Sequence, residues 1–129
     1  MGDVFMDFKK MEQEVEKMKK VNEIFQLCME INGFEDRQRS ITGSKPTVFF
    51  DFSGHVAGLD IRVFETGWEK EKEQERAFQI YLYNFFQESE GFEEEAVKYE
   101  EQIKTELDNC IQYLKRVKEG KYEYLQQVI

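Results

Sequence analysis

Residues 4–32 alternate apolar and charged side chains with the spacing of a helix. Apolar residues recur at intervals of three and four, and lysines and glutamates fill most positions between them. The apolar positions are Val4, Phe8, Met11, Val15, Met18 and Phe25. Asn22 occupies the heptad position that this series leaves polar, and near the end the stripe drifts onto Val21, Ile24, Cys28 and Ile31. The pattern predicts a long amphipathic helix that meets two different surfaces and stops at Asn32-Gly33.

A polar, aperiodic stretch follows from Phe34 to Pro46, and it contains Gly43 and the only proline of the chain. It predicts an exposed connection, and long connections often carry function. Beyond it, two runs rich in β-branched and aromatic residues, 47–52 and 59–64, flank a glycine-containing turn at 53–58. This order predicts a central antiparallel hairpin.

The hairpin should have one apolar face and one mixed face, because side chains alternate along a strand. The face expected to pack against helices carries Val48, Phe50, Phe52, Leu59, Ile61 and Val63. On the opposite face Asp51, Asp60 and Arg62 allow a cross-strand ion pair, and Phe49 and Phe64 are left partly exposed. We expect this second face either to be covered or to bind a partner.

Two further helices are predicted in the C-terminal half. Residues 69–88 resume helical spacing through Ala77, Phe78, Tyr81, Leu82, Phe85 and Phe86. After the break at Ser89-Glu90-Gly91, a helix over 92–118 carries Ala96, Tyr99, Ile103, Leu107, Cys110, Leu114 and Val117. Residues 121–129 are expected to add a short helical turn. The prediction is a single α+β domain over residues 1–129, with a long N-terminal helix, a central antiparallel β-hairpin and two C-terminal helices.

Composition indicates a folded chain and bears on its compartment. Of the 129 residues 40% are hydrophobic and 15% aromatic, which is too rich for an acidic disordered tail. No run of about 18 apolar residues occurs, and residues 1–10 lack an apolar signal core, so we expect neither a membrane span nor standard secretion. Cys28 and Cys110 lie in predicted helices and suit buried thiols, which favours a reducing cytoplasm.

The residues offer little support for an enzyme, a cofactor or a metal site. His55 is the only histidine, and in Ser53-Gly54-His55 it lies on a predicted turn where such residues usually cap the backbone. The two cysteines and the histidine have no zinc-binding spacing, and no calcium-binding loop motif is present. Thr42-Gly43-Ser44-Lys45 resembles the end of a phosphate-binding loop but is followed by a strand instead of a helix. We expect no enzymatic activity, no cofactor and no metal.

Charge is the feature most suggestive of function. The formal net charge is −9, which opposes direct binding of nucleic acid, and residues 69–108 hold 13 acidic and 5 basic side chains. The predicted partner-binding residues are Glu88, Glu90, Glu93, Glu94, Glu95, Glu100 and Glu101. One interpretation is a solvated face that also stabilises a helix start. The other is a field that steers the protein to a basic groove, where carboxylates take the place of phosphates.

The small size, the acidity, the glutamate-rich helices and the central stretch from Phe52-Ser53-Gly54-His55 to Gly67-Trp68 resemble small proteins of bacteriophages and mobile elements. Anti-CRISPR proteins are similar in size and charge. The resemblance implies a phage-type inhibitor that binds a Cas nuclease or another nucleic-acid-handling protein of the host. The alternative is a structural or regulatory oligomer, such as a homodimer, that associates through the N-terminal helix or through Phe49 and Phe64 on the sheet.

Overall fold

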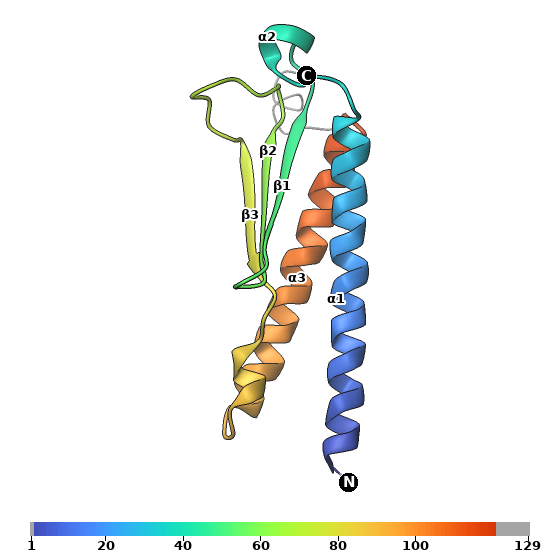
Figure 1. Cartoon of the computed structure of the whole chain (residues 1–129), viewed down its shortest axis with the longest axis vertical. Helices are drawn as coiled ribbons and strands as arrows, with labels where there is room; N and C mark the ends of the chain where they lie inside the picture. The colour runs from blue at the N-terminus through green and yellow to red at the C-terminus, as the bar shows by residue number, and fades with distance from the viewer. Residues whose placement is uncertain (1, 121–129) are drawn as a thin grey trace.

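The computed structural model is an α+β fold in which two long helices cover one face of a three-stranded sheet (Figure 1). It describes residues 2–120, with side chains from Phe8 onward. The elements in chain order are α1 (Gly2–Asn32), α2 (Arg39–Thr42), β1 (Thr47–Ser53), β2 (Gly58–Phe64), β3 (Arg76–Tyr81), the 3₁₀ helix η1 (Phe85–Glu88) and α3 (Glu93–Lys118). The predicted α+β class, the N-terminal helix and the hairpin are confirmed, whereas the short helical turn expected at 121–129 lies outside the described residues.

The sheet is an antiparallel meander in the order β1-β2-β3. Phe50 pairs with Ile61, and Ile61 pairs on its other side with Phe78. Because paired residues point to the same side of a sheet, all three side chains lie toward the helices. The central strand β2 therefore has a neighbour on both edges, and a hairpin that would be marginal alone gains a third strand.

The prediction of a helix over residues 69–88 is wrong. Residues 76–81 form the strand β3, and residues 85–88 form only the short η1. The apolar residues of this segment fit the period of a helix and that of a strand. In the structure Phe78 and Ile80 are buried, while Ala77, Gln79 and Tyr81 are exposed. This alternation favours a strand, and the unpaired edge of β2 supplies the hydrogen-bonding partners that a strand needs.

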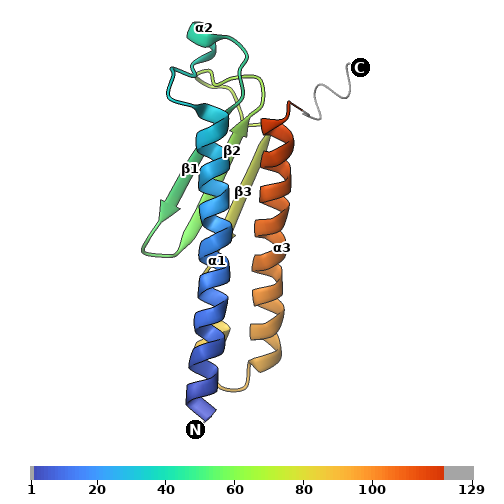
Figure 2. The same cartoon turned by 90° about the vertical axis from the view of Figure 1, so that its right-hand side faces the viewer.

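Helices α1 and α3 lie side by side and run in the same direction (Figure 2). Lys17 of α1 pairs with Glu100 of α3, and further along the pair Glu30 of α1 meets Lys118 of α3. The core between the helices and the sheet includes Ile24, Leu27, Cys28, Ile31, Leu59, Ile61, Val63, Ile80, Ile103, Leu107, Cys110, Leu114 and Val117. The predicted helix over 92–118 is confirmed as α3, whose first turn is acidic and whose last turn is basic, as the helix dipole favours.

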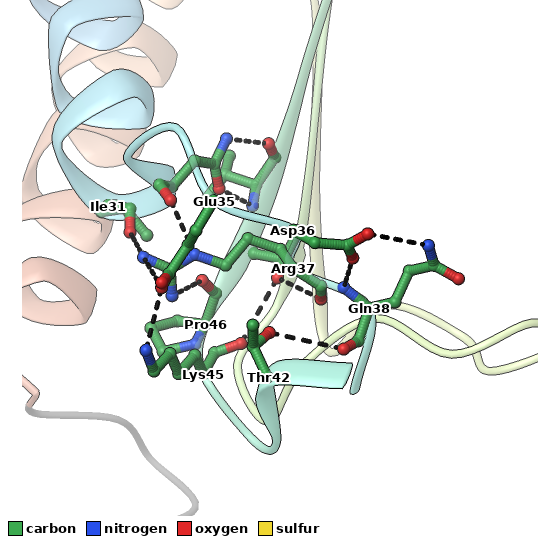
Figure 3. A network of polar contacts seen from close by, with 11 residues as sticks. Ile31, Glu35, Asp36, Arg37, Gln38, Thr42, Lys45 and Pro46 are labelled. Atoms are coloured by element: carbon green, nitrogen blue, oxygen red, sulfur yellow. Dashed lines mark hydrogen bonds and ion pairs between the residues drawn. The ribbon is translucent and has the colours of Figure 1, made fainter. Parts of the chain in front are cut away.

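The end of α1 is tied to the sheet by polar contacts (Figure 3). The Asn32 side chain donates to the carbonyl of Val48 at 2.7 Å and accepts from its N–H at 2.8 Å. Arg37 donates to the carbonyls of Ile31 at 2.8 Å and Asn32 at 2.6 Å, which have no partner further along the helix. The connection expected to be exposed between residues 34 and 46 is thus fixed at its start, and it contains α2.

The two faces of the sheet differ in cover. On the helix side Val48 and Val63 are buried as predicted, but Phe52, at the end of β1, is half exposed. On the other side Phe64 is buried, contrary to the prediction, and Phe49 lies edge-on to both Phe64 and Trp68. Trp68 belongs to the connection between β2 and β3, which therefore covers one end of this face.

Candidate functional site

The histidine lies apart from the two buried cysteines in the described structure. His55 is exposed on the hairpin turn, and within residues 2–120 no group of three or more histidine, cysteine or acidic side chains could hold a metal. Burial raises the pKa of the Cys28 thiol to about 12, and it also raises the pKa of Cys110. Both thiols therefore stay protonated and poorly nucleophilic at neutral pH. Over the same range neither long helix is apolar enough to cross a membrane.

Two of the seven glutamates predicted to bind a partner are engaged within the fold. Lys17 donates to Glu100 at 2.8 Å and to the carbonyl of Leu82 at 2.9 Å, and both ionic side chains are mostly buried. The side chain of Asn84 also donates to Glu100, at 3.3 Å. Glu88 accepts from Lys10 of α1 at 3.2 Å, in an exposed pair. Glu100 joins α1 to α3, so it is not available to an external partner.

The other five predicted glutamates lie exposed at one end of the molecule. We call this set, Glu90, Glu93, Glu94, Glu95 and Glu101, the acidic end. It occupies the turn after η1 and the first three turns of α3. None of the five forms an ion pair with a described side chain, although Glu93 accepts from the N–H of Gly91 at 3.3 Å. Nothing described neutralises this charge through direct contact.

The acidic end borders a hollow between α1 and the turn after η1. The hollow has a volume of about 430 Å³, and Lys9, Lys10, Glu90 and Glu93 are among the residues that line it. A hydrogen bond to Glu88 raises the pKa of Lys10, and one to Asp108 raises that of Lys20. These lysines remain charged at neutral pH, and Lys10 brings a positive charge to the α1 side of the hollow.

The sequence pattern did not identify which face of α1 stays exposed. The structure leaves one row of α1 side chains largely in solvent, which we call the apolar stripe. Its members, with their exposed fractions, are Phe8 (60%), Met11 (58%), Val15 (53%), Met18 (61%) and Phe25 (48%). The core takes the second series instead, with Ile24, Cys28 and Ile31 buried. The available signal was the presence of two apolar series, of which only one can face a given core.

A groove of about 540 Å³ lies beside the apolar stripe. Its apolar lining comes from α1, the hairpin and the segment after β3, through Met18, Val21, Phe50, Phe52 and Leu82. Lys17 and the buried Asn84 also line it. The Asn84 side chain donates to the carbonyl of Ala96 at 2.8 Å, and its Oδ1 has no hydrogen-bond partner among the described residues. Met18 belongs both to the stripe and to the lining of the groove, so the two surfaces adjoin.

Comparison with protein-family models, with curated proteins and with solved structures found no match for this chain.

Proposed function

We propose that the protein acts by binding a basic surface on another protein, and that the acidic end makes the contact. The class of partner is a nucleic-acid-handling protein of the host, such as a CRISPR-Cas effector. In this account the protein is a phage-type inhibitor without enzymatic activity, and its carboxylates occupy a site built for phosphates.

The observation that carries the proposal is the lack of neutralisation at the acidic end. Glu93, Glu94 and Glu95 are consecutive, so they fan out around the first turn of α3 instead of forming one row. Together with Glu90 and Glu101 they present five exposed carboxylates free of ion pairs with described side chains. Clustered charge of one sign raises the rate of encounter with the opposite sign, and salt screens it.

The acidic end lies on a rigid support, which favours a binding role over a solubilising one. Ala96, just after Glu95, is buried, and its carbonyl accepts from the side chain of Asn84. Lys17 connects the same region to α1 through Glu100. A preorganised charge array loses less conformational entropy on binding than a flexible tail. The two buried thiols fit a partner in the reducing cytoplasm.

The test is salt-dependent capture with variants that keep the fold. The immobilised protein is exposed to a bacterial lysate at low and at high salt, and bound proteins are identified by mass spectrometry. We expect a basic nucleic-acid-binding protein to be retained at low salt and released at high salt. When this captured protein is purified with its nucleic acid bound, addition of this chain should release the nucleic acid.

Two triple variants separate the acidic end from net charge. Glu93, Glu94 and Glu95 are replaced by glutamine in one, and Glu69, Glu71 and Glu73 in the other. The second set lies in the connection between β2 and β3, at the opposite end of the molecule from η1 (Figure 1). Both variants change the net charge equally, so we expect only the first to weaken binding, by at least tenfold. Equal weakening by both variants, or by neither, would refute a local acidic contact.

A further inference from the structure

The apolar stripe of α1 has the heptad pattern of a two-stranded coiled coil. Phe8, Val15 and Asn22 occupy position a, and Met11 and Met18 occupy position d. Val15 is β-branched, as two-stranded coiled coils favour at position a. The stripe runs about 26 Å from Phe8 to Phe25, from the rise per residue of a helix.

The core of this chain does not use these positions. Phe8, Met11, Val15 and Met18 are each more than half exposed, and Asn22 is exposed as well. Phe25 alone meets another described ring, that of Phe50, with centroids 5.3 Å apart. The surface from Phe8 to Asn22 is therefore free to meet a second helix, while the opposite side of α1 holds the core.

Two polar features of α1 select a second copy of this chain as the occupant. An asparagine at position a hydrogen-bonds its counterpart when two identical helices lie parallel and in register, and it penalises other arrangements. Glu14 and Lys19 occupy positions g and e of successive heptads, which face each other across a parallel pair. Neither side chain has an ion-pair partner among the described residues. Each would meet its complement in the partner copy.

We infer that the protein forms a parallel homodimer through the apolar stripe of α1, with Asn22 against Asn22 and Glu14 of each copy beside Lys19 of the other. A parallel arrangement places both acidic ends at the same end of the dimer, because the turn after η1 lies beside the N-terminal half of α1 through Lys10 and Glu88. The inference does not depend on the proposed function, but it would make acidic binding bivalent.

The contact between two copies of α1 and the contact with a basic partner respond to salt in opposite ways. The dimer joins two chains of formal charge −9 through apolar side chains, so screening of their repulsion favours it. Contact between the acidic end and a basic partner is attractive, so screening weakens it. A dimer that binds no partner at low salt would refute the proposed function alone, and partner binding by a protein that stays monomeric would refute the dimer alone.

Mass measurement over a dilution series tests the dimer. Light scattering after size exclusion should give twice the chain mass of 15.5 kDa at high concentration and approach the single mass on dilution. Val15→Glu places a charge in the stripe and should raise the dissociation constant at least a hundredfold. Val97→Glu is the matched control, because Val97 is a similarly exposed valine on α3. A monomer at all concentrations, or a dimer unaffected by Val15→Glu, would overturn the inference.

Cross-linking tests the parallel register. Met11→Cys places equivalent thiols across the interface at a separation that a disulfide can span, and oxidised glutathione should convert the dimer to a covalent form. Val97→Cys is the control and should stay uncrosslinked. The native thiols of Cys28 and Cys110 are buried and should not interfere. A dimer that Met11→Cys fails to cross-link would refute the parallel, in-register arrangement. A charge swap adds a second check: a mixture of Glu14→Lys and Lys19→Glu chains should form heterodimers in preference to either homodimer.

Discussion

The two halves of α1 contrast in how they are held. In the C-terminal half, Ile24, Cys28 and Ile31 are buried in the core, and Asn32 is hydrogen-bonded to β1. In the N-terminal half, the described contacts to the rest of the fold are mainly polar, and Lys10 and Lys17 provide two of them. One continuous helix is thus a core element at one end and carries exposed apolar side chains at the other.

The difference shows that helical amphipathicity alone does not identify the core. Both halves carry apolar residues at helical spacing, but the sheet extends along only part of α1 (Figure 1). Moreover, only one of the two apolar series of α1 faces the core, so the side chains of the other series have no cover inside the monomer. Substitutions in each half test this difference.

The largest expected effect on stability comes from the C-terminal half of α1, which we call the core half. Ile24→Ala removes a fully buried side chain and should reduce the free energy of unfolding by about 2–5 kcal/mol. Met11→Ala, in the apolar stripe, should change it by no more than about 0.5 kcal/mol in the monomer. Urea denaturation of dilute protein measures both. Comparable losses for the two variants would contradict the division of α1 into a core half and a surface half.

The next largest effect on stability is expected at the contact between the end of α1 and the sheet. Asn32→Ala leaves the N–H and the carbonyl of Val48 without their partner and should cost about 1–3 kcal/mol of unfolding free energy. Asn22→Ala, the same change at an exposed site of α1, should be nearly neutral in dilute solution. Thermal unfolding followed by circular dichroism compares them. If Asn32→Ala is also neutral, the Val48 contact does not hold the end of α1.

A smaller loss of stability is expected from Lys17, which connects the N-terminal half of α1 to α3. Lys17→Met removes the donor to Glu100 and to the Leu82 carbonyl and should cost about 1–2 kcal/mol, since solvent screens a partly buried pair. Lys19→Met is the control, because Lys19 is exposed and has no ion pair with a described residue. Equal stability of the two variants in a urea titration would argue that Lys17 does not anchor this half.

The smallest expected effect is on the pH dependence of stability, to which ion pairs in the two halves of α1 contribute at different pH. A hydrogen bond from Lys118 lowers the pKa of Glu30 below its ordinary value of 4.5, so this contribution to stability is present above that pH and is lost as pH falls through the lowered pKa. Hydrogen bonds raise the pKa of Lys10 and Lys20 above 10.5, so their contributions are present below that pH and are lost as pH rises through the raised values.

Unfolding temperatures measured across the pH range, in parallel with single variants, assign these contributions. Glu30→Gln should flatten the acidic limb slightly, and Lys20→Gln should flatten the alkaline limb. The assignment of these ion pairs would be wrong if each variant changed the opposite limb.

The sequence predicted the elements whose apolar spacing fits only one type of secondary structure, which are α1, the β1–β2 hairpin and α3. It failed at residues 76–81, where Phe78 and Ile80 fit a strand while Ala77, Phe78 and Tyr81 fit a helix. The choice is made by the free edge of β2, a tertiary feature that local spacing does not contain.

The candidate site was predictable only as a region of charge. Seven glutamates were proposed from their crowding, but which of them face inward depends on the position of α1. Lys17 engages Glu100 from 83 residues away in the chain, and Lys10 engages Glu88 in the same manner. Pairings so distant in sequence cannot be inferred from spacing along one helix. The exposure of the apolar stripe follows likewise from which face of α1 the core takes, because Ile24, Cys28 and Ile31 of the second series are the buried residues.

Hydrogen exchange of the backbone amides along α1, measured at low and at high protein concentration, tests the division of this helix. We expect amides of residues 24–31 to exchange slowly at both concentrations, because the core holds them. Amides of residues 8–18 should exchange faster in dilute protein and become protected as the concentration rises. Equal protection of the two segments, unchanged by concentration, would contradict the division of α1 into a core half and an associating half.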